Sequence, residues 1–248
     1  MNERQSKILV AVIEEYTKTG LPVGSSVLVE QYGFQVSPAT LRNDMSCLED
    51  LGFLYQPHTS AGRIPTDAGY RYFVEEVMPD RKLTKREQQS LQKELLQLKA
   101  QNTRLTRTTA KLLATLSGYV AVSGVPHKNE FSEFGLRSLM QDVGADELDD
   151  LCCLAESLDY IDERCESLMR KLADGETKIF IGADNPISKT TNYSMVVGQY
   201  ERDGEKGIVA LIGPKNMAYE RNKSLIDYVK KILGGTSIII VMIASNIN

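Results

Sequence analysis

The residues best suited to chemistry lie on the polar face of one predicted helix, which spans residues 37 to 51. The apolar positions of this helix recur at spacings of four, three and three, and they are Leu41, Met45, Leu48 and Leu51. Because those side chains are expected to face inward, Thr40, Arg42 and Asn43 are left on the outer face. Arginine matches the hydrogen-bonding edge of guanine in the DNA major groove, and asparagine matches that of adenine. The polar face is therefore compatible with a helix that reads base pairs.

A hairpin is predicted directly after this helix, with a first strand over residues 53–56 and a turn over residues 57–62. The polar residues at and beside its tip are His58, Thr59, Ser60 and Arg63. Hydroxyl groups and helix N-termini commonly hold DNA phosphates, which adds Ser25 and Ser37 as candidates. The predicted DNA-binding residues are accordingly Ser25, Ser37, Thr40, Arg42, Asn43, His58, Thr59, Ser60 and Arg63.

Two earlier helices are needed to position this polar face. Apolar residues at helical spacing over residues 8–16 predict a first helix, which Gly20 ends. A second helix is expected to begin at a cap formed by Ser25 or Ser26. The pair Ser37-Pro38 then supplies an N-cap and a proline at the first helical position. Two helices joined by a short turn, with a polar outer face on the second, are typical of a helix-turn-helix.

This pattern also has other interpretations. Three-helix cores of this kind serve as protein-binding modules, and Arg42 alone is equally explained as a solvated surface charge. Residues 1–78 carry six basic and ten acidic side chains, a balance that argues against indiscriminate phosphate binding. DNA binding by this segment therefore requires its few cations to gather on the contact surface.

Charge divides the 248-residue chain into three parts. Residues 81–118 hold nine basic and two acidic side chains, whereas residues 119–248 hold 14 basic and 20 acidic ones. We therefore predict a DNA-binding domain over residues 1–78, a basic helical connector over 79–118 and an acidic body over 119–248.

Composition excludes several classes of function. The chain has two histidines and four cysteines without a CxxC pair, so neither a metal site nor a disulfide framework is predicted. It has no Ser/His/Asp set and no glycine-rich phosphate loop, so we expect neither an enzyme nor a cofactor. The longest apolar run, residues 238–244, is shorter than the roughly 20 residues of a membrane span, and the N-terminus lacks a signal-peptide pattern. A cytoplasmic protein without membrane contact is expected.

Several longer sequence motifs resemble those of one known protein family. The runs that carry it are SPATLRNDM at residues 37–45, LEDLGFL at 48–54 and QPHTSAGRIPTDAGYR at 56–71, together with IGADN at 181–185, SMVVGQY at 194–200 and IGPKNMAYER at 212–221. With them the chain resembles the HrcA-type heat-inducible transcription repressors. The resemblance covers roughly residues 2–78 and 177–233. Family members are longer, and between Val125 and Phe131 this chain skips part of the usual body.

The resemblance implies an α+β fold, with an N-terminal winged helix-turn-helix, a connector and a GAF-like domain that lacks part of the family body. It also implies a homodimer on an inverted-repeat operator in double-stranded DNA, upstream of chaperone operons. The chaperonin GroEL is the implied modulator, and repression is lost on heat stress.

The connector and body have their own patterns. Leucines seven apart at Leu91, Leu98, Leu105 and Leu112 predict a stripe that packs either on a partner chain or on the body, and Asn102 interrupts it. In the body we predict strands over 119–125, 178–181, 193–200 and 207–212, one long helix over 148–172 and a final helix over 216–233. The apolar tail at 237–243 is expected to add a strand or a contact between subunits.

These observations favour a repressor of heat-shock chaperone operons that binds DNA as a dimer. The alternative is a winged-helix regulator gated by a small ligand or a protein partner in its C-terminal domain. An adaptor whose DNA-binding head has lost its activity is a further possibility that the acidic head leaves open.

Overall fold

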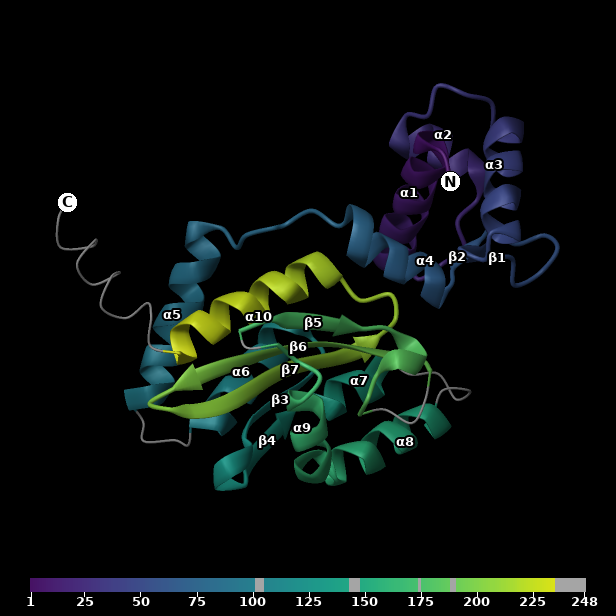
Figure 1. Cartoon of the computed structure of the whole chain (residues 1–248). Helices are drawn as coiled ribbons and strands as arrows, with labels where there is room; N and C mark the ends of the chain where they lie inside the picture. Colours follow the sequence, from purple (N-terminus) through teal and green to yellow (C-terminus); the bar gives the residue numbers. More distant parts are fainter. Residues whose placement is uncertain (101–104, 143–147, 174, 188–190, 235–248) are drawn as a thin grey trace, which may run out of the picture. The chain divides into compact units, whose positions relative to one another are not determined.

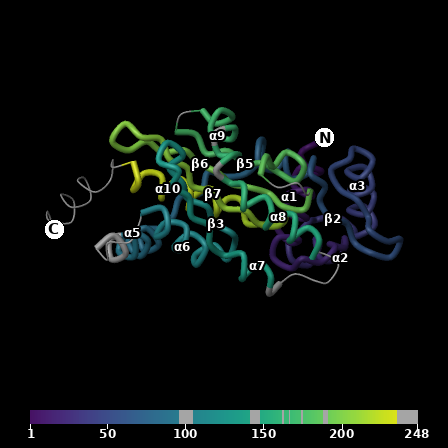
Figure 2. The backbone as a smooth tube through the Cα atoms, turned by 90° about the horizontal axis from the view of Figure 1, so that it is seen from below, coloured from purple at the N-terminus to yellow at the C-terminus, as the bar shows by residue number. Residues whose placement is uncertain are grey.

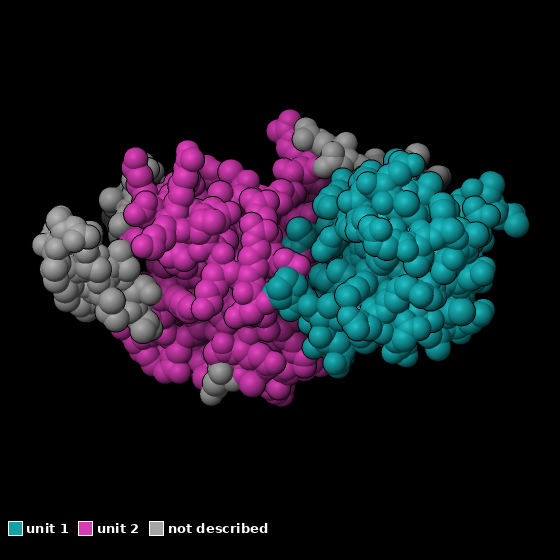
Figure 3. Space-filling model, turned by 90° about the horizontal axis from the view of Figure 1, so that it is seen from above, with its two compact units in different colours: residues 1–79, 215–218 teal, residues 80–214, 219–248 magenta. Residues whose placement is uncertain are grey.

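The structure is a computed structural model, and it describes residues 1–100, 105–142, 148–173, 175–187 and 191–234. The chain forms two compact units, shown in two colours in Figure 3. The first comprises Met1–Pro79 and Lys215–Ala218, and the second comprises Asp80–Pro214 and Tyr219–Asn248. The connector therefore clusters with the second unit, and its treatment as a separate part stays a prediction. Within the described residues, no helix is both long and apolar enough to cross a membrane.

Three helices build the core of the first unit: α1 (Glu3–Thr19), α2 (Ser25–Tyr32) and α3 (Pro38–Asp50) (Figure 1). Gly20 ends α1 at a φ of 66°, and the Ser37 hydroxyl accepts a hydrogen bond from the Thr40 amide at the start of α3, as predicted. The predicted serine cap of α2 is wrong, because Gly24 is the N-cap residue and contributes no side-chain hydrogen bond.

The apolar stripe of α3 packs inward, with one exception. Leu41, Met45 and Leu48 are at most 1% exposed. Leu51 is 53% exposed, so its predicted burial is wrong. The helix ends at Asp50, and Leu51, as the C-cap residue, no longer follows the helical stripe.

The predicted hairpin is present as β1 (Leu54–Tyr55) and β2 (Ile64–Pro65), which pair antiparallel. A separate bridge joins Val23 to Arg63, with both backbone N–H···O distances at 2.9 Å. The helix α4 (Asp67–Tyr72) follows and continues as a π-helical turn over Phe73–Val77. The hairpin is thus anchored at its base to the segment that precedes α2.

The second unit is built on a five-stranded antiparallel sheet, which confirms the α+β class. Its strands, in spatial order, are β4 (Glu130–Phe134), β3 (Val120–Val125), β7 (Glu205–Pro214), β6 (Tyr193–Arg202) and β5 (Thr177–Phe180). A turn at Asp203-Gly204 joins β6 to the neighbouring β7 (Figure 2), and both residues have positive φ, as a tight hairpin turn requires. The sequence analysis missed β4, whose five residues are each partly or fully exposed.

Helices cover both faces of this sheet. They are α5 (Lys85–Ala100), α6 (Leu105–Ser117), α7 (Leu136–Asp142), α8 (Leu148–Asp159), α9 (Ile161–Met169) and α10 (Tyr219–Leu233). Figure 1 shows α10 over one face and α8 and α9 below the other. The main apolar cluster joins α8 and α9 to the inward residues of the strands, among them Val120, Met195 and Ile212.

One prediction for these helices is corrected, and parts of the connector and the tail lie outside the described residues. The prediction of a single helix over 148–172 is wrong, because the helix is interrupted at the exposed Tyr160, which separates α8 from α9. The apolar spacing continues through that break, so periodicity gave no sign of it. In the connector, Leu91, Leu95 and Leu112 are buried within this chain. Asn102 and the tail at 237–243 lie outside the described residues.

Candidate nucleic-acid interface

The outer surface of α3 carries the polar side chains that the sequence placed there. Arg42 and Asn43 are exposed, and Thr40 is partly buried. No described residue forms a hydrogen bond or ion pair with the side chain of Arg42 or Asn43. Both side chains are therefore available to a partner from outside the first unit.

A cavity of about 380 Å³ lies within the first unit, where α2, α3 and the hairpin meet. It brings together five predicted site residues, which are Ser25, Arg42, Thr59, Ser60 and Arg63. Ser37, Thr40, Asn43 and His58 do not line this cavity. The cavity is lined by a helix start, two arginines and hydroxyl groups, which are the parts of a phosphate-binding surface.

The start of α2 differs from its prediction in a way that matters for this surface. Ser25 is only 8% exposed, whereas its neighbour Ser26 is exposed and also lines the cavity. Gly24 supplies no side-chain cap, and among the described residues no side chain satisfies the first backbone N–H groups of α2. Ser26 and these N–H groups are thus better placed than the Ser25 hydroxyl to meet an anion.

Arg63, one of the predicted DNA-binding residues, is paired with an acid of the first unit. Its Nη2 lies 2.8 Å and its Nε 3.0 Å from Oε2 of Glu49, and its side chain is 11% exposed. The guanidinium is therefore bound to α3 rather than extended from the hairpin tip. Oε1 of Glu49 also accepts a hydrogen bond from the backbone N–H of Gln56 at 3.1 Å. One carboxylate thus ties both ends of the hairpin to α3.

The hairpin loop is further held by Gln56, whose Nε2 donates to the carbonyls of Thr59 at 3.1 Å and Ala61 at 2.7 Å. Gly62 passes so close to Val23 that a Cβ at position 62 would lie 2.4 Å from the Val23 carbonyl. These contacts fix the loop conformation, and His58, Thr59 and Ser60 remain exposed.

A second ion pair positions α3 against α1. Arg4 donates from Nε to Oδ2 of Asp44 at 2.8 Å and from Nη2 to Oδ1 at 3.2 Å. This hydrogen bond and the charge of Asp44 raise the pKa of Arg4. The sequence analysis missed this pair, although an acid three residues after Leu41 falls on the buried stripe and signals an internal partner.

No group of three or more His, Cys, Asp or Glu in the described part of the chain is arranged to hold a metal ion. The four cysteines are free thiols, and Cys165 is the buried one. The interface is thus made of cations, amides, hydroxyls and backbone N–H groups.

Comparison with known proteins finds relatives among the HrcA repressors. A family model described as the HrcA protein C-terminal domain matches residues 134–222. The chain is 46% identical over 132 residues to the heat-inducible transcription repressor HrcA of Synechococcus elongatus, an alignment that covers 53% of this chain and 37% of that protein. Identity to the HrcA repressor of Moorella thermoacetica is 42% over 132 residues, covering 53% of this chain and 38% of that protein. The predicted resemblance is confirmed, and the alignments span less than two-fifths of the length of these two relatives.

A solved structure shares the fold. The crystal structure of a hypothetical protein matches with a TM-score of 0.72 at 20% sequence identity, covering 94% of this chain and 98% of that chain. At that identity the match supports the architecture alone.

Proposed function

We propose that this chain, which resembles the HrcA-type repressors, is a DNA-binding transcription repressor of heat-shock chaperone genes that acts in the cytoplasm and not as an enzyme. The observation that carries the proposal is the surface of the first unit on which the start of α2, Arg42 and the hairpin loop meet. The names of the relatives support the repressor role.

The proposed contacts follow from the exposure of each side chain. Arg42, Asn43 and Thr40 read base edges from α3. The N-terminus of α2 and the hydroxyls of Thr59 and Ser60 hold phosphates, with His58 beside them and Ser37 at the start of α3. In this proposal Arg63 positions the hairpin through Glu49, and the three helices with the hairpin act as a winged helix-turn-helix.

The state in which the chain binds is also a proposal, and it rests on the resemblance. A homodimer places two recognition helices on an inverted-repeat operator with two-fold symmetry. The second unit is proposed to act as a reduced GAF-like domain. The chaperonin GroEL is the proposed modulator, and heat stress is proposed to release the operator.

A fluorescence-anisotropy titration at two salt concentrations tests this function. It compares a duplex that carries the inverted repeat upstream of a chaperone operon of the source genome with a scrambled duplex of equal composition. We expect clear preference for the repeat and a modest salt slope, because the first 78 residues carry only six basic side chains. Equal affinity for both duplexes at both salt concentrations contradicts the proposal.

One observation favours a second candidate function, a regulator whose second unit binds a small ligand. That unit contains a cavity of its own beside α10. A ligand that changes operator affinity at constant salt would establish this function in addition to the first.

A further inference from the structure

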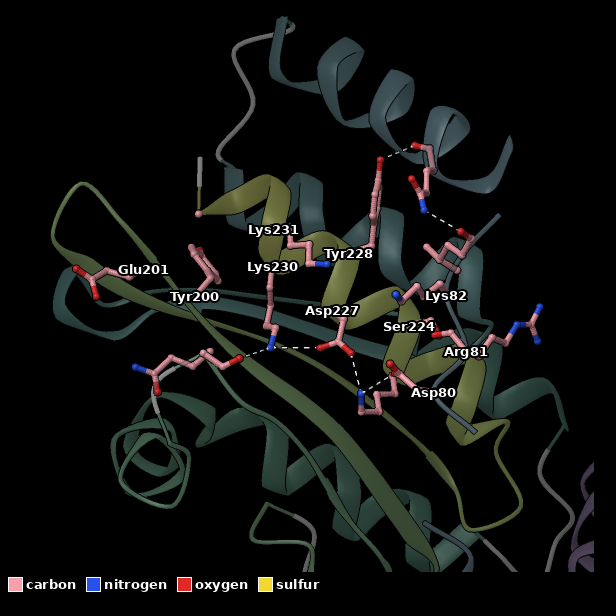
Figure 4. Close-up of a pocket in the computed structure, with 16 residues that line it drawn as sticks. Asp80, Arg81, Lys82, Tyr200, Glu201, Ser224, Asp227, Tyr228, Lys230 and Lys231 are labelled. Atoms are coloured by element: carbon pink, nitrogen blue, oxygen red, sulfur yellow. Dashed lines mark hydrogen bonds and ion pairs between the residues drawn. The ribbon is translucent and has the colours of Figure 1, made fainter. Parts of the chain in front are cut away.

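A cavity in the second unit has a volume of about 510 Å³. It lies between α10, the segment Asp80–Leu83 and the end of β6 at Tyr200 and Glu201 (Figure 4). Cavities that bind small molecules measure roughly 300–1,000 Å³, so this one has the required size. All of its lining residues belong to the second unit.

Cations outnumber acids in the lining. The cationic side chains are Arg81, Lys82, Lys223, Lys230 and Lys231, and the acidic ones are Asp80, Glu201 and Asp227. An excess of positive charge in a concave, partly desolvated site attracts anions. The chemistry of the cavity therefore depends on which of these charges are already paired.

Asp227 is already neutralised by lysines of its own helix. Its Oδ2 lies 3.0 Å from Nζ of Lys223, and its Oδ1 lies 3.4 Å from Nζ of Lys230. Burial opposes its ionisation, but the hydrogen bonds from Thr177 and Lys223 and the two lysine charges together lower the pKa of Asp227. Asp80 adds a second carboxylate, with its Oδ1 3.8 Å from Nζ of Lys223, so the two acids balance the two lysines. The excess of cations in the lining therefore comes from Arg81, Lys82 and Lys231, against the one acid Glu201.

Two other lysines are left without a counter-charge. No described residue forms an ion pair or hydrogen bond with the ammonium of Lys82 or Lys231. Figure 4 shows both side chains directed toward the space beside Tyr228, one from the segment before α5 and one from α10. The Tyr228 hydroxyl already donates to the Gln88 carbonyl at 3.1 Å, so it is fixed in the wall.

The segment that carries Lys82 is itself held in place. The Ser224 hydroxyl of α10 donates to the carbonyl of Arg81 at 2.5 Å, and Leu83 is 8% exposed. A lysine on an anchored backbone is positioned at a smaller entropic cost than one on a free loop. The two unpaired ammonium groups are therefore features of a preformed cavity.

We propose that this cavity binds a small molecule with at least two negative charges, which Lys82 and Lys231 hold from opposite sides. The ligand class is a small polyanion, either a phosphate ester or a polycarboxylate. The site goes beyond the proposed DNA binding, and its occupation is measured with no DNA present.

Isothermal titration of the full-length chain tests the site, with inorganic pyrophosphate and citrate as separate probes at matched ionic strength. We expect saturable binding with one site per chain for at least one probe. The double variant Lys82→Ala/Lys231→Ala should bind at least tenfold more weakly. Saturation by pyrophosphate alone identifies a phosphate ligand, saturation by citrate alone identifies a carboxylate ligand, and saturation by both supports the shared chemistry.

The matched control is Lys93→Ala/Lys111→Ala, which removes two exposed lysines of α5 and α6 that do not line the cavity. Circular dichroism confirms that both variants are folded. Absence of saturation with both probes, or equal weakening in the two double variants, overturns the proposal.

Discussion

Arg42 differs from two other cations of the first unit in having no partner among the described residues. Arg4 is bound to Asp44, and Arg63 is bound to Glu49. A cation that already has a carboxylate partner must lose that partner before it can bind DNA. Arg42 gains a DNA contact without this cost, and it lines the cavity shared by α2 and the hairpin.

We predict that Arg42→Ala weakens operator preference by about 1–3 kcal/mol, or roughly 5- to 150-fold, because a bidentate base contact is lost. The free energy of unfolding should stay the same, since the side chain is exposed. Arg42→Lys serves as the matched control: it keeps the charge and the salt slope but loses preference for the operator. Anisotropy titrations check both variants, and full operator preference in Arg42→Ala would exclude α3 as the reading helix.

Asp227 illustrates how a paired carboxylate stabilises the second unit. Its pKa in the folded chain is lowered below the ordinary value of 3.8. The ionised form is therefore favoured by folding, and its contribution is complete above pH 3.8. As pH falls through the lowered pKa, the carboxylate is protonated and the contribution disappears.

We predict that Asp227→Asn lowers the free energy of unfolding by roughly 1–2 kcal/mol at pH 6, because two lysines lose their shared partner. The difference from the unmodified chain should shrink as the pH approaches 3. Urea unfolding at the two pH values measures it, with Asp203→Asn in the exposed β6–β7 turn as the control. A difference that is the same at both pH values would show that ionisation of Asp227 does not contribute.

At the scale of elements, Glu49 connects α3 to the hairpin. Its two carboxylate oxygens accept hydrogen bonds from the backbone N–H of Gln56 and from the Arg63 guanidinium, which lie on opposite sides of the loop. The loop hydroxyls and α3 are therefore held in one arrangement. A change at Glu49 acts on DNA binding through geometry, since it removes no group proposed to touch DNA.

We predict that Glu49→Gln weakens operator binding by roughly fivefold, equivalent to about 1 kcal/mol, the upper range for a partly exposed ion pair. The slope of log affinity against log salt should not change, because no phosphate contact is removed. Asp50→Asn, an exposed acid on the same helix, is the control for the charge change. A steeper salt slope in Glu49→Gln would mean that Arg63, released from Glu49, contacts phosphate itself.

The sequence predicted those elements whose signals are local. Ser37 with Pro38 marked the start of α3, and Gly20 marked the end of α1. Each signal depends on residues at most three positions apart. The two ion pairs that organise the first unit depend on partners 40 and 14 positions apart, which spacing alone cannot match.

Misassigned elements have an equally physical explanation. The helix is interrupted at Tyr160, but Leu158, Ile161 and Cys165 remain on the same buried stripe. The strand β4 lies at the edge of the sheet, and none of its residues is fully buried, so it lacks the apolar run that revealed β6 and β7. Periodicity reports which face is buried and is insensitive to breaks and edges.

At the scale of the whole molecule, the distribution of charge bears on how the proposed DNA binding should respond to salt. The chain has a formal net charge of −4, yet residues 81–118 hold nine basic and two acidic side chains. Lys85 and Arg86 at the start of α5 are exposed. Glu87 follows them, and its hydrogen bonds with Thr84 lower the pKa of Glu87, so it carries a negative charge next to the two cations.

Because Glu87 places a negative charge beside them, we expect Lys85 and Arg86 to face solvent and not to bind phosphate. We predict that Lys85→Ala/Arg86→Ala leaves both operator affinity and the salt slope unchanged, because the proposed phosphate contacts all come from the first unit. Each phosphate contact that is lost reduces the slope by about 0.9, so titration over a fourfold range of salt resolves a single contact. If the slope falls in the double variant while the operator is still preferred over a scrambled duplex, the connector is part of the DNA interface. The footprint of the protein on DNA must then extend beyond the first unit.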